Sequence, residues 1–319
     1  MNKKIGFIFP GQGAQYPGMG KDFYDQFPVS RKTFEEADTL LGTNFSELIF
    51  NGSAAELKLT KNSQLSIFIV SVAILRALQE KFPALVPQVA AGLSLGEYTA
   101  LVAANKISFK EALFLVKARA EYMNDACLAK EGGMSVILGL DALVVESVIQ
   151  EVQKEHQVWV ANLNCPLQVV IAGTPSGIEA ASIRLKEKGA KRILPLEVSG
   201  AFHSGLMKPA QDRLEPRIRF AALQGSAIAL VMNVAGGYVS TLDEMRRNMI
   251  LQVTHPVRWE QGIKAMAKEN VDFFIEMGPG RTLTGMNKKI LPSAHSISIE
   301  KVSDFALLTE QLQEQYAST

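Results

Sequence analysis

The chain has 319 residues, of which 47% are hydrophobic and 20% charged, and its formal net charge is +1. This length allows a substantial core in one large domain or two, and the composition is typical of a soluble globular protein. The near-neutral charge gives no indication of nucleic acid or of a membrane surface as a partner. Cys127 and Cys165 have no metal-ligand spacing to any histidine, so we expect neither a metal site nor a disulfide. No stretch reads as a signal peptide or approaches a membrane span, and a cytoplasmic location is expected.

The first predicted element is a buried strand over residues 5–10, which leads into a glycine-rich loop over residues 11–15. The loop lacks the Gly-Lys-Ser/Thr of a phosphate loop and the third glycine of a dinucleotide fingerprint. It is therefore interpreted as a strand-to-helix turn, in which Gln12 could offer a backbone N–H to a ligand. Short helices over residues 21–50 and a longer apolar-striped helix over residues 62–82 are predicted next.

Residues 89–98 read as a short apolar strand, a turn that carries Ser94, and the start of a helix. Gly92 and Gly96 flank Ser94 at the spacing of a nucleophile elbow, where the tight backbone requires small residues. The turn would place the hydroxyl at the helix N-terminus, whose free N–H groups can stabilise an oxyanion. The alternative is that Ser94 is only the N-cap, since Glu97 would complete a capping box.

A helix is predicted over residues 108–129, and Arg119 lies on its apolar face. An arginine that faces inward needs an anionic partner. That partner is either a carboxylate of the protein, in a buried salt bridge, or a substrate carboxylate bound by the planar guanidinium. The pattern alone favours the salt bridge.

Residues 132–198 read as strand, helix, strand, strand, helix and strand, which is the ferredoxin-like order. The chain would return from this unit at a small-residue segment that contains His203. Clefts tend to form at such junctions. The remaining histidines, His156, His255 and His295, lie in less informative surroundings. His203 is therefore the best candidate for a base that activates a serine, although a lone histidine is more often structural.

Further strands and helices alternate from residue 227 to the C-terminus, which predicts an α/β fold with a mainly parallel sheet covered on both faces. We expect a large catalytic domain made of residues 1–130 and 200–319, with residues 131–199 as an inserted subdomain.

Six stretches together resemble the malonyl-CoA:acyl-carrier-protein transacylases of fatty-acid and polyketide synthesis. The resemblance covers essentially the whole chain, and the stretches keep their order. They are Phe9-Pro10-Gly11-Gln12-Gly13, Gly92-Leu93-Ser94-Leu95-Gly96-Glu97-Tyr98, Arg119, residues 164–173 with the pattern Asn-x-Pro-x-Gln-Val-Val-Ile-Ala-Gly, Gly200-Ala201-Phe202-His203-Ser204 and Gly278-Pro279-Gly280.

This resemblance implies a hydrolase-like α/β domain with an inserted ferredoxin-like subdomain. It also implies that Ser94 is the nucleophile, that His203 is the base and that Arg119 pairs with the malonyl carboxylate. The backbone N–H groups of Gln12 and Leu95 would form the oxyanion hole.

The same resemblance implies that the backbone carbonyl of Gln252 orients the histidine. The run of residues 200–204 resembles the form associated with malonyl rather than methylmalonyl substrates. The family commonly has a histidine just before the nucleophile, and Leu93 takes its place here. That departure leaves the Ser-His pair intact but changes the local polarity of the elbow.

The implied reaction transfers a malonyl group from malonyl-CoA to the phosphopantetheine thiol of acyl carrier protein through a malonyl-serine intermediate. No metal or other cofactor is expected to take part. One alternative is a serine esterase or thioesterase on the same scaffold, with water as the acceptor. No acid between Ser94 and His203 stands out as the third member of a triad, which favours a dyad. Another alternative is a carrier-protein-binding module with a degenerate site.

Overall fold

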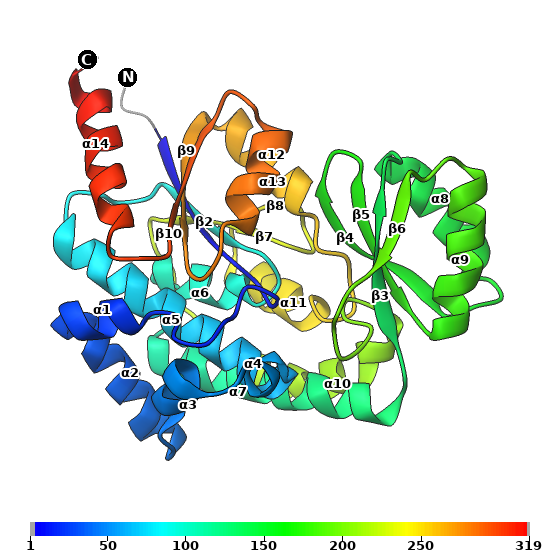
Figure 1. The fold of residues 1–319 in the computed structure, drawn as a ribbon, viewed down its shortest axis with the longest axis horizontal. Coiled ribbons are helices and arrows are strands. Elements are labelled where there is room, and N and C mark those ends of the chain that lie inside the picture. Colours follow the sequence, from blue (N-terminus) through cyan, green and yellow to red (C-terminus); the bar gives the residue numbers. More distant parts are fainter. Residues whose placement is uncertain (1–3, 318–319) are drawn as a thin grey trace.

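The computed structural model describes residues 4–317, with side chains up to residue 313. Two sheets lie next to each other, and the chain builds most of the larger one from its two ends (Figure 1). The smaller sheet and its two helices come from the middle of the chain. The predicted α/β fold class, a parallel-sheet domain with a ferredoxin-like insertion, is confirmed.

The larger sheet has six strands in the order β10-β9-β1-β2-β7-β8, and all neighbours are parallel except β7 and β8. Along β1, Phe7 and Phe9 join one hydrophobic cluster while Ile8 joins another, so the strand is apolar on both faces. The strands are β1 (Lys4–Phe9), β2 (Val89–Gly92), β7 (Ala229–Met232), β8 (Gly237–Val239), β9 (Val271–Met277) and β10 (His295–Ile299).

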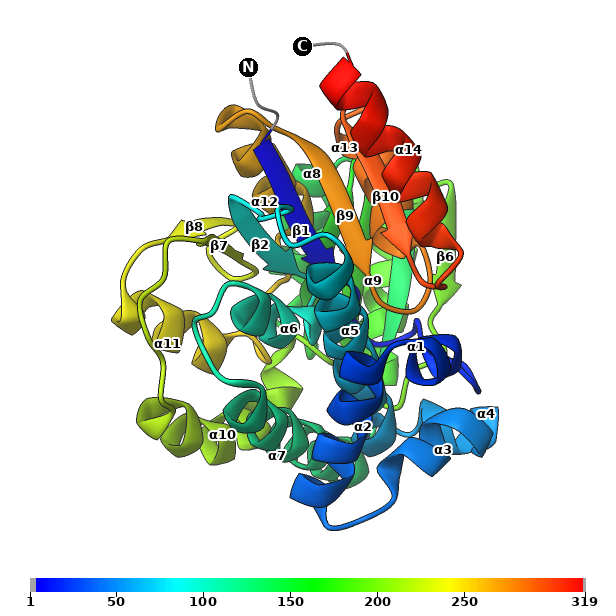
Figure 2. The same cartoon turned by 90° about the vertical axis from the view of Figure 1, so that its left-hand side faces the viewer.

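Helices cover both faces of this sheet (Figures 1 and 2). Two of them, α12 (Trp259–Lys268) and α13 (Thr282–Ile290), cover the Ile8 face. The others extend from the opposite face. They are α1 (Lys21–Gln26), α2 (Pro28–Leu41), α3 (Phe45–Asn51), α4 (Ala54–Lys58), α5 (Thr60–Lys81), α6 (Gly96–Ala103), α7 (Phe109–Ala129), the short 3-10 helix η1 (Gly205–Met207), α10 (Lys208–Phe220), α11 (Leu242–Leu251) and α14 (Asp304–Ala317).

Helix α5 corrects one expectation from the sequence. It has 22 residues and contains an 18-residue window with a mean hydropathy of 1.2, so it is long and apolar enough to cross a membrane. However, 83% of the relevant window is buried inside the protein, as in a core helix of a globular domain. By length and composition, α5 contradicts the expectation that no stretch approaches a membrane span. The burial of α5 explains why this stretch is apolar.

The smaller sheet has the order β4-β5-β3-β6, and its neighbours are antiparallel. Together with two helices it gives the predicted βαββαβ sequence of elements. They are β3 (Gly133–Leu138), α8 (Ala142–Val152), β4 (Val158–Cys165), β5 (Gln168–Gly173), α9 (Pro175–Glu187) and β6 (Arg192–Pro195). The division into domains at residues 130 and 200 stays a prediction.

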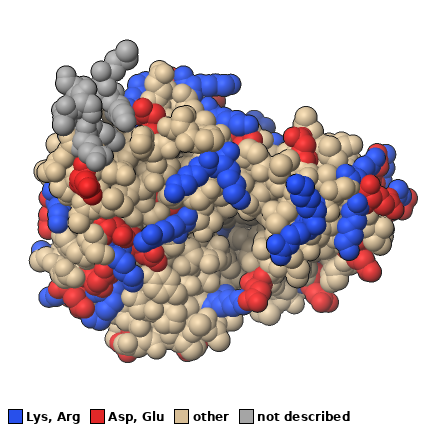
Figure 3. All heavy atoms as spheres, turned by 45° about the horizontal axis from the view of Figure 1, so that its top comes forward, with Lys and Arg blue, Asp and Glu red and all other residues tan. Residues whose placement is uncertain are grey.

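Strand β4 of the smaller sheet is hydrogen-bonded to the segment between α11 and α12 of the larger part. The backbone N–H of Leu163 in β4 donates to Val257 O at 2.9 Å, and Val257 N donates to Ala161 O at 2.8 Å. In the space-filling view the surface is hollowed between the larger and the smaller part, with lysine and arginine side chains gathered around the hollow (Figure 3). Side chains from both parts therefore lie close enough to line a common site.

Candidate active site

Ser94 lies on a strained turn between β2 and α6. Its φ of 52° is in the left-handed region, which non-glycine residues seldom adopt. A Cβ on Gly92 would lie 2.0 Å from the backbone C of Gly96, and a Cβ on Gly96 would lie 2.1 Å from Phe9 O. The two glycines are required because the turn packs backbone against backbone, as predicted for an elbow.

The alternative interpretation of Ser94 as a helix N-cap is wrong. Helix α6 begins at Gly96 with Leu95 as its N-cap residue, and no side chain caps it. The Glu97 carboxylate is hydrogen-bonded to Asn233 and Gln252 instead of reaching back to the turn. The Ser94 hydroxyl contacts His203 and Arg119 instead.

His203 lies directly beside the Ser94 hydroxyl. Ser94 Oγ and His203 Nε2 are 2.8 Å apart, and His203 Nδ1 is 2.8 Å from the Gln252 backbone carbonyl. Because a carbonyl can only accept, Nδ1 carries the proton and Nε2 is left to accept one from the hydroxyl. Burial, assisted by the positive charge of Arg119, lowers the pKa of His203 to about 4. The imidazole is thus neutral at physiological pH, as a base must be.

Arg119 is only 1% exposed, and its partners are neutral oxygens. It donates to Gln64 Oε1, to Ser94 Oγ at 3.0 Å and to Gln252 Oε1 at 3.0 Å. Within the described part of the chain no carboxylate forms an ion pair with it. The salt bridge that the pattern favoured is therefore wrong, because two glutamine amides and a hydroxyl take the place of the expected acid.

The guanidinium of Arg119 retains unused hydrogen-bonding capacity. Of its five N–H donors, the Nε–H has no acceptor among the described residues, and the contacts above occupy three others. Burial lowers the pKa of Arg119, although an arginine stays protonated under ordinary conditions. A buried cation next to Ser94, with donors to spare, is suited to a small anionic group.

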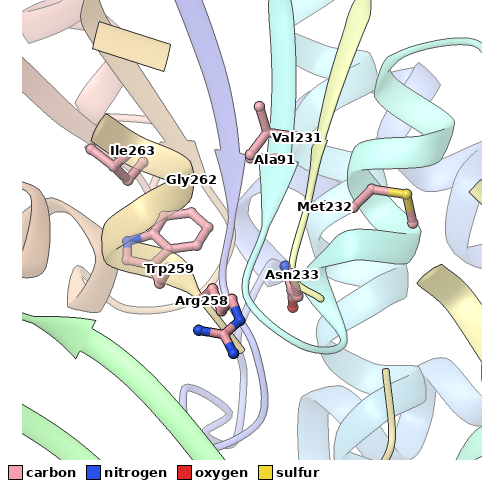
Figure 4. A pocket seen from close by; sticks show the side chains of 8 residues that line it. All are labelled: Ala91, Val231, Met232, Asn233, Arg258, Trp259, Gly262 and Ile263. Atoms are coloured by element: carbon pink, nitrogen blue, oxygen red, sulfur yellow. The ribbon is translucent and has the colours of Figure 1, made fainter. Parts of the chain in front are cut away.

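Two polar residues at the site, Gln64 and Asn233, were missed from the sequence, and Glu97 was given only a capping role. Asn233 follows β7 and lies beside the turn after β2 (Figure 4). Its Oδ1 accepts the Ser94 N–H at 2.7 Å, and its Nδ2 donates to Gly92 O at 2.7 Å. The Asn233 side chain therefore holds the backbone of the elbow turn by two hydrogen bonds, one to Gly92 and one to Ser94. In the sequence, Gln64 is marked only as a polar residue inside an apolar helix, and no sequence feature marks Asn233.

Glu97 is fully buried behind Ser94. Its Oε2 accepts the Asn233 backbone N–H at 2.6 Å, and its Oε1 accepts Gln252 Nε2 at 2.9 Å. Burial raises the pKa of Glu97 to about 8, whereas the Asn233 N–H, the Arg119 charge and the Gln252 amide stabilise the carboxylate. The sequence had suggested a capping role for this residue.

A pocket opens in front of Ser94 and His203, with walls from the smaller sheet and from loops and helices of the larger part. Gln12 and Leu93 line it on one side, and Asn162 and Asn164 of β4 line it on the other. Leu93 is half-buried and packs against the hydrophobic cluster on the α12 side of the sheet. An apolar residue therefore occupies the position before the serine.

The other oxyanion candidate, Leu95, is buried directly after the serine. Among the described residues the backbone N–H groups of Gln12 and Leu95 have no hydrogen-bond acceptor. Over the same range no group of three or more His, Cys, Asp or Glu side chains is placed to hold a metal ion. The geometry as a whole is that of an α/β enzyme with a serine and a histidine in contact at the base of a pocket.

The particular family follows from comparison with known proteins. Residues 6–310 match the family model described as "Acyl transferase domain". The chain is 43% identical over 313 residues to the malonyl CoA-acyl carrier protein transacylase of Bacillus subtilis strain 168, covering 98% of each chain. It therefore belongs to the acyl transferase family and is an acyltransferase.

Solved structures agree with this assignment. The malonyl CoA-acyl carrier protein transacylase of Clostridium perfringens superposes with a TM-score of 0.93 at 34% identity, covering 98% of both chains. A second solved structure is described as a type II PKS acyl-carrier protein in complex with its malonyl-transacylase. One chain of that complex superposes with a TM-score of 0.91 at 37% identity, covering 97% of this chain and 99% of that one.

Proposed function

We propose that this acyltransferase moves a malonyl group from malonyl-CoA to the phosphopantetheine thiol of an acyl carrier protein, by way of a malonyl ester on Ser94. The observation that carries the proposal is the position of Arg119, whose buried guanidinium donates to Ser94 Oγ at 3.0 Å. A carboxylate bound there would place the acyl carbonyl of the same small group next to the hydroxyl.

In the first half-reaction His203 Nε2 takes the proton of Ser94 as the oxygen attacks the thioester carbonyl. The Gln252 carbonyl holds the Nδ1–H and so orients the ring through both half-reactions. The backbone N–H groups of Gln12 and Leu95 receive the oxyanion, a contribution of about 3–4 kcal/mol per donor in serine enzymes. The tetrahedral adduct collapses, CoA leaves as its thiol with the proton from His203, and the acyl group stays on Ser94.

In the second half-reaction the carrier's thiol attacks the malonyl ester and gives its proton to His203. Collapse returns the proton to Ser94 and releases malonyl carrier protein. A thioester is consumed and a thioester is formed, so the reaction is nearly balanced in free energy and runs in both directions. We further propose that residues 131–199 form a subdomain that supplies one wall of the pocket, and that the protein works in the cytoplasm.

Intact-protein mass spectrometry tests this function. Incubation with malonyl-CoA is expected to add one malonyl group to the wild-type chain and none to Ser94→Ala. Ser298→Ala, at a buried serine of β10 whose partners are Thr284 and Glu276, is the matched control and is expected to retain the label. A label on Ser94→Ala would contradict the assignment of the nucleophile.

Addition of a holo carrier protein to the labelled enzyme then distinguishes the alternatives. Transfer of the malonyl group to the carrier supports the transacylase. Release of free malonate at the same rate with or without carrier would instead indicate a serine esterase or thioesterase. A chain that takes up no label would be a binding module.

A further inference from the structure

Glu97 is the only acidic side chain in the described structure that is hydrogen-bonded to residues holding Ser94, His203 and Arg119. Its two oxygens have separate partners, the backbone N–H of Asn233 and the side-chain amide of Gln252. The proposed mechanism gives Glu97 no proton and no contact with substrate. A fully buried carboxyl group is costly to keep, so its presence calls for a physical reason.

The Gln252 side chain is the link between Glu97 and Arg119. Its Nε2 donates to Glu97 Oε1 at 2.9 Å and to Ser94 O at 2.8 Å, which leaves Oε1 to accept from Arg119 at 3.0 Å. Both acceptors of Nε2 are oxygens, and so they determine which end of the amide faces Arg119. If the amide were reversed, an N–H group would face the guanidinium.

We propose that Glu97 is a positioning residue, which acts through the Gln252 amide to hold Arg119 in the place where it meets the substrate carboxylate. The inference rests on the proposed function, because only a malonyl substrate makes the position of Arg119 matter. One oxygen of Glu97 is fixed by a backbone N–H, which cannot rotate away. In this structure the other oxygen accepts from Gln252 Nε2.

Glu97→Gln tests the proposal with a nearly isosteric change. The Asn233 N–H belongs to the backbone, so the new amide is expected to keep its oxygen on that side. Its NH2 group then meets Gln252 Nε2, donor against donor, and the Gln252 side chain must turn. Arg119 loses an acceptor, and the preference for malonyl-CoA falls.

The readout is the ratio of kcat/KM for malonyl-CoA to kcat/KM for acetyl-CoA. Acetyl has no carboxylate, so general damage to the fold or to the Ser94–His203 pair lowers both constants and leaves their ratio unchanged. We expect Glu97→Gln to lower the ratio about tenfold, the effect of losing one hydrogen bond to a charged group.

Glu276→Gln is the matched control. Glu276 is also fully buried, and it accepts from the backbone N–H groups of Leu283 and Thr284. Its partners lie in α13 and in β10, where Ser298 donates to it. In the described part of the chain none of these partners is hydrogen-bonded to Ser94 or Gln252. The control is therefore expected to lower the melting temperature without changing the malonyl-to-acetyl ratio.

A second pair of variants keeps the test decisive if Glu97→Gln alone does not fold. Gln252→Met removes the amide but keeps the backbone carbonyl that holds His203. If Glu97 acts through that amide, Glu97→Gln/Gln252→Met has the same ratio as Gln252→Met.

The malonyl-to-acetyl ratios of these variants decide whether the inference about Glu97 holds. A ratio for Glu97→Gln within about twofold of the wild type would overturn the inference, as would a further fall in the double variant. In either case wild-type malonyl transfer would show that the proposed function still stands. A wild-type protein that transfers no malonyl would overturn both.

Discussion

The replacement Arg119→Ala tests how the buried guanidinium contributes to substrate choice. A carboxylate about 4 Å from the guanidinium gains about 4 kcal/mol at an effective dielectric constant of about 20. Each 1.4 kcal/mol corresponds to about a factor of ten. Since acetyl-CoA has no carboxylate, the malonyl-to-acetyl ratio of kcat/KM is expected to fall by about two to three orders of magnitude.

The structure also sets the effect of this replacement on stability. Gln64 Oε1 and Gln252 Oε1 lose a charged donor, and an unsatisfied buried acceptor costs about 1–3 kcal/mol. The adjacent pocket allows water to replace part of the guanidinium. We therefore expect the free energy of unfolding to fall by about 2 kcal/mol, which leaves the protein folded.

The assay pairs transfer rates for both CoA esters with a thermal melt. Arg119→Lys keeps the charge but replaces the planar fork by a single ammonium group, and is expected to recover only part of the ratio. Arg213→Ala is a surface control, because Arg213 and Asp125 form a half-exposed pair and should contribute at most about 1 kcal/mol. An unchanged ratio together with a strongly lowered melting temperature would refute the reasoning and make Arg119 a purely structural residue.

Three further predictions concern the role of His203, its pKa and the elbow. His203→Ala is expected to slow pre-steady-state acylation by about 10²–10⁴-fold, and a larger loss in His255→Ala, at an exposed histidine, would show that the base is misassigned. Because burial and the Arg119 charge lower the pKa of His203 to about 4, acidification removes the base only near that pH. The acylation kcat/KM should therefore stay level from neutral pH to about pH 5 and fall below it, and a fall centred near pH 6.5 would argue for an unperturbed histidine. Gly92→Ala should fail to fold, since its Cβ would lie 2.0 Å from backbone, whereas Gly285→Ala, in an open helical position, should raise the free energy of unfolding by up to about 1 kcal/mol as measured by denaturant titration.

The sequence predicted those parts of the site that come from local motifs. The elbow around Ser94 follows from two glycines whose spacing has a direct steric cause, and the structure has that geometry. Ser94 and His203 are 109 positions apart, and their pairing was suggested by the junction segment around His203 and implied by the family resemblance. Their roles in catalysis remain predictions.

The supporting residues could not be predicted in the same way. Gln64, Asn233 and Glu97 each lie in a different element, and each acts through one or two hydrogen bonds that no spacing encodes. The sequence also could not show that Arg119 is satisfied by neutral amides, because an inward-facing arginine suggests a carboxylate first. Strand β8 was missed because three residues with a glycine give no alternating pattern.

The contribution of the smaller sheet to the pocket has a consequence for protein engineering. Met134, Val136, Asn162, Asn164, Gln168 and Val170 of the smaller sheet line the pocket. The hydrogen bonds around Ser94 join residues of the larger part alone. Libraries confined to the smaller sheet should therefore alter the size and polarity of the accepted acyl chain while the reactive centre keeps its geometry.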